Sequence, residues 1–580
     1  PSPNDTLAHC YRLAMSMHYL AAVLSVALGA ILVLRLALLK WRKNGGRAGE
    51  ACLPPGSRGL PLLGETLQFF APSPTLELPP FFKQRLDRYG PIFRTSVVGE
   101  DLIVSLDTEL NARALQQEER AFEIWYPPSF MRVLGADSIV AALGPLHRHI
   151  RALVLRLFGP ESLRLALLRD VERSARAELR SWLGRPDVEV RAATSRMIFC
   201  VTAKKLISHD DAAAQGSLWK CFDACTRGLL AFPLRVPGTA FYKCMQASKH
   251  PQCDRPSLQI EYPIFVSFSY LPASIFLSSD SDDHLPMHQG RERVMKLVKQ
   301  QLGERRSAAE REAVDFFDVV IDELDRPGTE MSENIALDLL FLLLFASHET
   351  TSIGLTAILK FLTDNPKALQ ELTASETCSG YFCCCITTFL CLCPEHQCHE
   401  KCHKISLSCL RLCFQEEHEN IQKRRVDPDS EITWEEYKSM KFTSHVIHEA
   451  LRLANIAPVV FRKAKQDVQI KGYTIPKGSK IMICSSAAHM NPEVYEDPAV
   501  FNPWRWKDIP EPVGGSKDFM AFGGGVRLCV GADFAKLQMS IFLHCLLIKY
   551  RWKAISGGTM VFYPGLRFPG GFHIHLLRKD

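Results

Sequence analysis

Three long apolar stretches dominate the hydrophobic pattern of this 580-residue chain, and each has the length of a helix. Residues 13–39 contain no acidic side chain and two basic ones, His18 and Arg35. Residues 335–362 are almost wholly apolar, and a helix that is apolar on all sides is buried. After a glycine-rich loop, apolar residues recur at helical spacing over residues 532–547. The pattern predicts a membrane span, a long buried helix and a second helix behind the loop.

The first stretch is long enough to cross a bilayer. Four basic side chains follow between positions 40 and 47, so the positive-inside rule leaves the C-terminal bulk in the cytosol. A cleavable signal peptide would place its charges first and end in a small-residue cleavage site, and neither is seen. We therefore expect a single-pass anchor at 13–39 and a basic, Pro/Gly-rich hinge at 40–65. Residues 1–12 are expected to be a leader that does not belong to the mature protein.

The composition of the chain indicates which kinds of partner and which cellular compartment to expect. The formal net charge is +6, which is small for this length and does not suggest nucleic acid as a partner. Ten of the 20 cysteines crowd between positions 378 and 413, whereas a secreted disulfide scaffold is short and spaces its cysteines throughout. We expect the bulk of the chain to lie in a reducing compartment.

The glycine-rich loop FGGGVRLCVG, from Phe522 to Gly531, places Cys529 just before a predicted helix. At a helix N-terminus, backbone N–H groups lower the pKa of a thiol and favour the thiolate that a metal needs. A nucleotide-phosphate loop is excluded because the Lys-Ser/Thr pair is missing and GGG is not GxGxxG. A buried structural cysteine remains the plain alternative when the loop is considered alone.

The second chemical feature interrupts the apolar segment at 335–362 with the sequence ASHETT, residues 346–351. An acid such as Glu349 inside a core helix is costly unless it is paired or functional. The alternative for Thr350 is a hydrogen bond to its own helix backbone, a common habit of buried threonine.

The cysteine loop resembles the haem-ligand signature FxxGxRxCxG of the cytochrome P-450 family. The matching residues are Phe522, Gly525, Arg527, Cys529 and Gly531. The resemblance implies that Cys529 is the axial thiolate ligand of a haem b iron and that Arg527 pairs with a haem propionate. Residues 346–351 resemble the oxygen-activation motif [AG]Gx[DE]T, with Ser347 in place of the second glycine. Glu349 and Thr350 are then the acid and alcohol that relay protons to dioxygen.

The sequence EALR, from Glu449 to Arg452, resembles the ExxR helix of the same family. Acid and base three residues apart share one helical face and can pair. In the family this pair locks with the arginine of an FxPxRW segment, here Arg505 of FNPWRW, and holds the cysteine loop. The resemblance therefore gives all three residues structural roles.

Two further arginines are candidates for the haem propionates, because carboxylates attract guanidinium forks. Arg151 lies in a stretch that resembles the WxxxR helix, with His147 in place of tryptophan. Arg462 follows the ExxR helix. Taken alone, each is better explained as a surface arginine, but together with Arg527 and the order of the motifs along the chain the three favour propionate contact.

The resemblance implies a mainly α fold with a small β region, an N-terminal transmembrane helix and a catalytic domain at 66–580. Haem would lie between the 335–362 helix and the Cys529 loop. The reaction would be monooxygenation with dioxygen, with electrons from NADPH–cytochrome P-450 reductase, because the chain has no flavin or nicotinamide fingerprint. FNPWRW and FGGG resemble the plant clan that acts on sterols, brassinosteroids and triterpenoids. We expect a lipophilic substrate and an endoplasmic reticulum membrane location, with the catalytic domain facing the cytosol.

Two blocks, at about 247–289 and 375–415, interrupt this resemblance and read as translated intervening sequence. The first shows no sustained period and would be an unusually long irregular insertion. In the second, cysteines and histidines between 393 and 403 could supply zinc ligands, but their spacing matches no two-pair zinc knuckle. Two alternatives to an active monooxygenase stay open: an impaired product of an intron-retaining transcript, and a haem-thiolate isomerase or dehydratase.

Overall fold

The computed structural model describes residues 52–60, 64–134, 138–210, 218–223, 287–307, 315–364, 417–427, 429–507, 509, 516–563 and 565–579. The predicted anchor at 13–39 and nearly all of both atypical blocks lie outside these residues. The helices are α2 (Thr66–Phe69), α3 (Pro80–Tyr89), α4 (Thr108–Gln116), α5 (Pro128–Leu134), η1 (Ile139–Ala141), α6 (Gly144–Phe158), α7 (Pro160–Ser162), η2 (Leu163–Leu167), α8 (Leu168–Trp182), α9 (Val190–Ile207), α12 (Met287–Arg306), α13 (Phe316–Leu324), α14 (Glu333–Thr363), α18 (Trp434–Ser439), α19 (Lys441–Ala454), α20 (Ser485–His489), η4 (Pro503–Trp506), η5 (Gly525–Arg527) and α21 (Ala532–Lys549).

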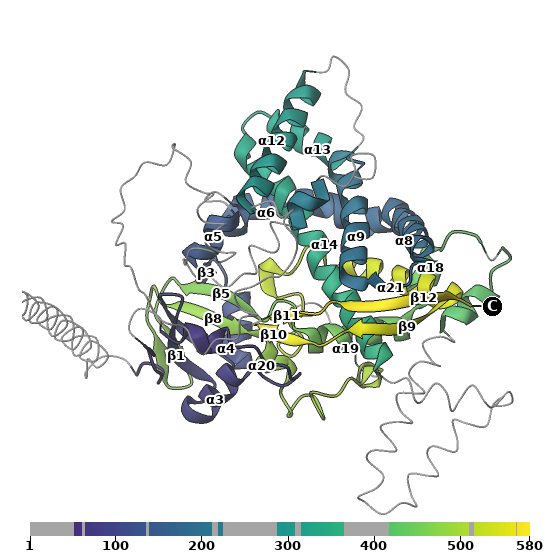
Figure 1. The fold of residues 1–580 in the computed structure, drawn as a ribbon. Helices are drawn as coiled ribbons and strands as arrows, with labels where there is room; N and C mark the ends of the chain where they lie inside the picture. The colour runs from purple at the N-terminus through teal and green to yellow at the C-terminus, as the bar shows by residue number, and fades with distance from the viewer. Residues whose placement is uncertain are drawn as a thin grey trace, which may run out of the picture.

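The strands are short and lie in the lower half of the view in Figure 1, with β1, β5 and β8 at the left and β9 and β12 at the right. They are β1 (Ile92–Val97), β2 (Glu100–Ser105), β3 (Phe122–Ile124), β4 (Val188–Glu189), β5 (Val459–Ala464), β6 (Val468–Ile470), β7 (Tyr473–Ile475), β8 (Lys480–Cys484), β9 (Tyr550–Gly557), β10 (Val561–Tyr563), β11 (Gly565–Arg567) and β12 (Phe572–Arg578). The largest sheet has the order β1-β2-β8-β5-β3, in which β2 and β8 are parallel and the other neighbours antiparallel. The fold is thus mainly helical with a small β region, which confirms the predicted class.

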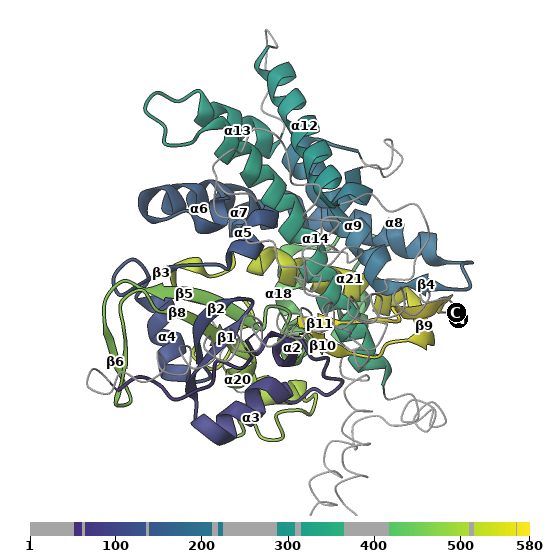
Figure 2. The same ribbon diagram turned by 60° about the vertical axis from the view of Figure 1, so that its left-hand side comes forward.

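The long helix α14 runs through the middle of the molecule, between the sheet and the outer helices (Figures 1 and 2). Ser332 begins it by accepting a hydrogen bond from the Ile335 amide, which satisfies one free donor of the first turn. The helix packs against α9, α19 and α21. Its apolar residues are buried almost throughout, which confirms the buried helix predicted at 335–362.

Gly354 lets α14 approach its neighbours closely. A Cβ atom at this position would lie 3.1 Å from the Met539 sulfur on α21 and 3.4 Å from a Leu451 methyl on α19. Interiors are packed too densely to absorb such a group without some shift of these side chains. The contact brings the helix with ASHETT directly against the two helices that carry the ExxR pair and follow the cysteine loop.

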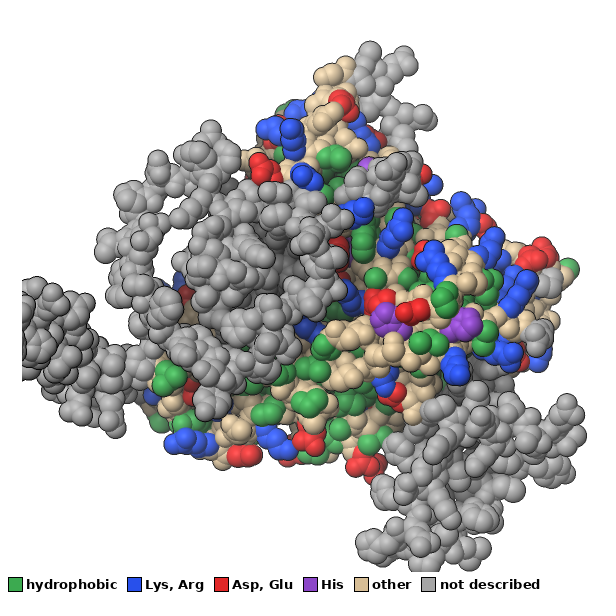
Figure 3. Space-filling model, viewed as in Figure 1, with side chains coloured by type: hydrophobic (Ala, Val, Ile, Leu, Met, Phe, Trp, Pro, Cys, Tyr) green, Lys and Arg blue, Asp and Glu red, His purple; other side chains and the backbone are tan. Residues whose placement is uncertain are grey.

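Among the described residues, α14 is the one helix long and apolar enough to cross a membrane, with a mean hydropathy of 1.3 over its most apolar window. Because 67% of that window is buried inside the fold, we assign α14 to the core. On the face in Figure 3, basic and acidic side chains are interspersed over the helical half of the molecule.

Candidate functional site

The cysteine loop is a closed turn that ends at the start of α21. The Cys529 amide donates to the Phe522 carbonyl over 3.0 Å, and Gly531 is the N-cap of α21. Gly525 has a φ of +64°, and a Cβ there would lie 2.0 Å from the Leu115 carbonyl oxygen at the end of α4. Only glycine fits this backbone conformation and this contact together. The loop is therefore pressed against α4, 410 positions earlier in the chain.

The pKa of the Cys529 thiol differs from the sequence-based prediction. Burial by the surrounding loop raises its pKa, and the opposing effect of the Gly531 N–H is smaller. The expected lowering by the helix N-terminus is therefore outweighed by desolvation, and ionisation would need a bound cation. Cys529 is nonetheless an exposed residue, so the loop does not close over it completely.

Three arginines predicted to bind propionates lie around this loop. Arg151 of α6 donates to the Leu528 carbonyl over 2.6 Å, one residue before Cys529. Arg527 Nε donates to a carboxylate oxygen of Glu118 over 2.5 Å, and Arg462 Nη2 lies 3.0 Å from the other Glu118 oxygen. The sequence analysis did not single out Glu118, one of two adjacent acids in the polar stretch QQEER.

The cluster contains polar atoms whose bonding capacity is not met. Arg462 Nε and His147 Nδ1 are buried and have no hydrogen-bond partner within the described ranges. Burial lowers the pKa of His147, and the nearby Arg527 lowers it further, so the imidazole stays neutral. Buried guanidinium donors beside an open thiol fit a flat metal complex that carries carboxylates, as haem does.

The predicted ExxR pair forms a bidentate ion pair that is fully buried. Arg452 Nε and Nη2 donate to the two Glu449 oxygens over 2.9 and 2.8 Å. Arg505 Nε reaches Glu449 over 3.0 Å, and the Trp506 indole N–H donates to the same carboxylate over 3.0 Å. The structure thus brings together the three residues that the sequence grouped, and it adds Trp506.

His489 connects this ion pair to the cysteine loop and was missed by the sequence analysis. Its carbonyl accepts from Arg452 over 2.6 Å, and its Nε2 accepts from the Met520 amide over 2.9 Å. Nδ1 then carries the proton that is shared with Asn455 Oδ1 over 2.6 Å. Burial lowers the pKa of His489 to about 3. No motif surrounds His489 in the sequence, so nothing in the sequence indicated its role.

Glu349 and Thr350 are neighbours in the chain but make different bonds. Glu349 pairs with Arg191 of α9, whose Nη1 lies 3.1 Å from both carboxylate oxygens. Burial raises the pKa of Glu349, and Arg191 offsets part of that rise. The Thr350 hydroxyl donates to the Ala346 carbonyl over 3.0 Å, the backbone bond that the alternative interpretation required. Thr350 and Ala346 are nevertheless exposed, so this turn of a core helix faces open space.

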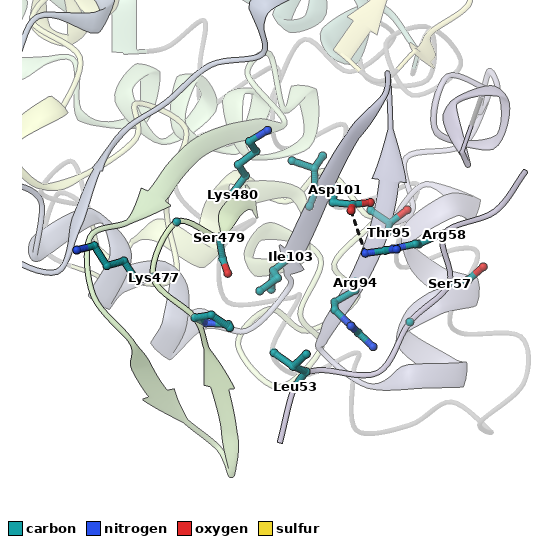
Figure 4. A pocket seen from close by; sticks show the side chains of 14 residues that line it. Leu53, Ser57, Arg58, Arg94, Thr95, Asp101, Ile103, Lys477, Ser479 and Lys480 are labelled. Carbon is teal, nitrogen blue, oxygen red and sulfur yellow. Dashed lines mark ion pairs between the residues drawn. The ribbon is translucent and has the colours of Figure 1, made fainter. Parts of the chain in front are cut away.

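A separate cavity of about 550 Å³ lies between the hinge and strands β1, β2 and β8 (Figure 4). Arg58 pairs with Asp101 over 3.0 Å in this cavity, and Figure 4 shows Lys477 and Lys480 pointing away from its centre. None of the predicted site residues lines it, so this cavity is distinct from the candidate site at the cysteine loop.

A mainly helical fold, an exposed loop cysteine and three arginines around its loop are the features of a haem-thiolate protein. The sequence profile of the family described as Cytochrome P-450 matches residues 257–375 and 412–564. A rice relative (Oryza sativa subsp. japonica), cytochrome P-450 87A3, is 44% identical over 571 residues, which cover 98% of this chain and 93% of that protein. The chain belongs to the cytochrome P-450 family: it is a haem-dependent monooxygenase with a cysteine thiolate as the axial iron ligand.

Two further relatives carry names that state their reactions. Cucurbitadienol 11-hydroxylase of Siraitia grosvenorii is 34% identical, covering 93% of this chain and 96% of that protein. Beta-amyrin 16-alpha-hydroxylase of Maesa lanceolata is also 34% identical, covering 97% of this chain and all of that protein. The solved structure of retinoic acid bound cyanobacterial CYP120A1 has a TM-score of 0.67 at 22% identity and covers 91% of this chain and 100% of that chain. That likeness confirms the fold.

Family membership implies a redox partner, dioxygen and a lipophilic substrate. The profile match breaks off at 375 and resumes at 412, within a few residues of the ends of the cysteine-rich block. It begins at 257, inside the first atypical block, and so does not separate that block from its surroundings.

Proposed function

We propose that this protein hydroxylates a sterol or triterpenoid, inserting one oxygen atom of dioxygen into a C–H bond and reducing the other to water. The observation that carries the proposal is the exposed Cys529 in a loop that contains Arg527 and is bonded to Arg151, together with the buried Arg462 guanidinium, whose Nε has no partner among the described residues. The substrate class rests on relatives whose names specify cucurbitadienol and beta-amyrin hydroxylation.

In this proposal Cys529 ligates the haem iron, and Arg151, Arg462 and Arg527 receive the propionates. Phe522 closes the loop through its carbonyl, while Gly525 and Gly531 supply the close backbone approach and the start of α21. When bound, haem supplies the redox chemistry that activates dioxygen. The protein orients the cofactor and shields the thiolate from water.

Glu349 and Thr350 carry protons in the proposed mechanism. Since burial raises the pKa of Glu349, its carboxyl takes up and releases a proton closer to neutral pH than an exposed glutamate does. Arg191 keeps the carboxylate in place between turnovers. The Thr350 hydroxyl, held by Ala346, stands on the open side of α14, where its oxygen can accept a second hydrogen bond.

Electrons reach this chain from NADPH through NADPH–cytochrome P-450 reductase, and residues 13–39 anchor the enzyme in the endoplasmic reticulum membrane with its catalytic domain in the cytosol. We propose further that the blocks at about 247–289 and 375–415 are translated intervening sequence. The gap in the family match between 375 and 412 supports this for the second block.

The test uses two recombinant chains, the full 580 residues and a version without both blocks. Each is assayed for binding spectra with cucurbitadienol, beta-amyrin and cholesterol, and for hydroxylated product with reductase and NADPH. A spin-state shift and a product one oxygen heavier with at least one panel member are expected from the shortened chain. If that chain binds haem through a thiolate yet gives neither signal with any of the three, the substrate class is wrong. Equal activity of both chains would contradict the proposed origin of the blocks.

A further inference from the structure

The Glu118 side chain is completely enclosed, and its two oxygens lie near two different arginines: one oxygen accepts a hydrogen bond, and the other is in ion-pair contact without hydrogen-bond geometry. Oε1 accepts from Arg527 Nε over 2.5 Å, and Oε2 lies 3.0 Å from Arg462 Nη2. Glu118 and Arg527 lie 409 positions apart in the sequence. Burying a carboxylate costs free energy unless it is paired, so the two arginines are what stabilise the ionised Glu118 side chain in this position.

The backbone around Glu118 is fixed on both sides. The Glu119 amide donates to the Phe122 carbonyl over 2.7 Å, and the Phe122 amide donates to the Gln117 carbonyl over 3.2 Å. Strand β3 begins at Phe122 and pairs with β5 so that Ile124 lies opposite Arg462. The Glu118 carboxylate is therefore held in a fixed position between the cysteine loop and the sheet that carries Arg462.

The loop is anchored to the same region by two further contacts. Gly525 packs on the Leu115 carbonyl, three positions before Glu118. The second guanidinium arm of Arg527 donates to the Ala142 carbonyl. Arg527 is thus fixed by both of its donor arms, and its remaining nitrogen, Nη1, is available to an anion.

The net charge of the side chains around the cysteine loop balances that of the two haem propionates only when Glu118 is included. The charges that act on His147 are those of Arg527, Glu118, Arg151 and, least of the four, Glu119, so these groups form one electrostatic cluster. Glu119 is balanced by its own ion pair with Arg148, and Arg462 joins the cluster through Glu118. Three guanidiniums and one carboxylate leave an excess of two positive charges. Haem carries two propionates, so the assembled site is electrically balanced, whereas without Glu118 it would keep one uncompensated buried cation.

We propose that Glu118 is a positioning residue for the cofactor: it holds Arg462 and Arg527 where they receive the haem propionates and sets the charge of their site. This rests on the propionate role proposed above for the arginines. The competing explanation is a purely structural tie between α4 and the cysteine loop. The two differ because a tie changes stability alone, whereas a charge beside the cofactor also changes its reduction potential.

The experiment compares Glu118→Gln and Glu118→Asp with Glu119→Gln in the full-length holoprotein. Glu119 is a matched control, since it pairs with the exposed Arg148 over 2.8 Å and lies one residue away. Measured are the ferric/ferrous potential, the rate of haem transfer to apomyoglobin and the melting temperature.

Glu118→Gln is expected to raise the potential, because removing a negative charge disfavours the more positive ferric state. Glu118→Asp keeps the charge but shortens the reach, so the potential stays at the wild-type value while haem transfer becomes faster, on the order of tenfold for one weakened charge-assisted hydrogen bond. Glu119→Gln changes neither.

A melting temperature that falls in both Glu118 variants, with potential and haem transfer at wild-type values, overturns the proposal in favour of the structural tie. A wild-type protein that fails to bind haem through a thiolate would instead refute the proposed ligand arrangement. The two failures are therefore distinguishable.

Discussion

The two sides of the proposed haem site are built in opposite ways. On the cysteine side, Glu449 accepts five hydrogen bonds, two from Arg452 and one each from Arg505, Trp506 and the Asn502 amide. On the α14 side, Thr350 holds one backbone carbonyl and faces open space. A ligand loop must be rigid, while side chains that move protons must be free to change partners. The number of hydrogen bonds that a side chain makes thus distinguishes the residues that hold the ligand loop from those proposed to move protons.

The largest effect is expected from Arg452→Leu, on the rigid side. It leaves the Glu449 carboxylate buried with a lost bidentate partner, a change that costs about 3–5 kcal/mol of folding free energy. We expect no haem-containing soluble protein, as measured by haem absorbance per polypeptide. Arg148→Leu is the control, because its ion pair with Glu119 is exposed and worth at most about 1 kcal/mol. Normal haem content in Arg452→Leu would show that the dense network is dispensable.

Glu349→Gln tests the sparse side, where we expect loss of chemistry without loss of structure. Removing a general acid from a proton relay lowers turnover by about 100-fold or more. The carbon monoxide spectrum and melting temperature should stay near wild type. Product formation and dioxygen consumption are measured together, since protons delivered out of place divert reduced oxygen to peroxide. Unchanged turnover would remove Glu349 from the mechanism.

Arg191→Leu gives a smaller effect of defined sign. Burial raises the pKa of Glu349 and Arg191 counteracts it, so removing the arginine raises that pKa further. Because Glu349 acts as a general acid in this proposal, its protonated form is active, and the basic limb of the pH–rate profile moves to higher pH. The profile is measured under saturating reductase, with Lys205→Leu, on the same helix but paired with Asp170, as control. A limb that moves down or stays in place contradicts the assigned role of Arg191.

Acid should weaken the whole fold gradually through its buried histidines. Burial lowers the pKa of His489 and His448 to about 3, and that of His348 to about 4, below the usual value near 6.5. A depressed pKa means that the neutral form is favoured in the folded state. The contribution is fully present above pH ~6.5 and is lost as pH falls toward these values. Melting temperatures at pH 7, 6 and 5 should fall in that order, and a flat series would contradict the argument.

The sequence predicted the parts of the site that depend on short spacing. The apolar run of α14, the glycine loop before α21 and the i, i+3 pair of Glu449 and Arg452 can all be read locally. The contacts of Glu118, His489 and Arg191 could not be predicted in this way. Arg191 meets Glu349 over 158 positions, and such a contact depends on how α9 crosses α14. Sequence spacing also gave the wrong direction for the pKa of the Cys529 thiol. Burial, which depends on the whole fold, raises this pKa by more than the helix N-terminus lowers it.

The most direct test of the central claim is the carbon monoxide difference spectrum of the reduced protein in wild-type, Cys529→Ser and Cys200→Ser forms. Cys200 is another cysteine in the described part of the chain and lies on α9. We predict the thiolate-type Soret band in the wild type and in Cys200→Ser, and its complete loss in Cys529→Ser. A Cys529→Ser protein that retains the band would contradict the assignment of Cys529 as the haem ligand.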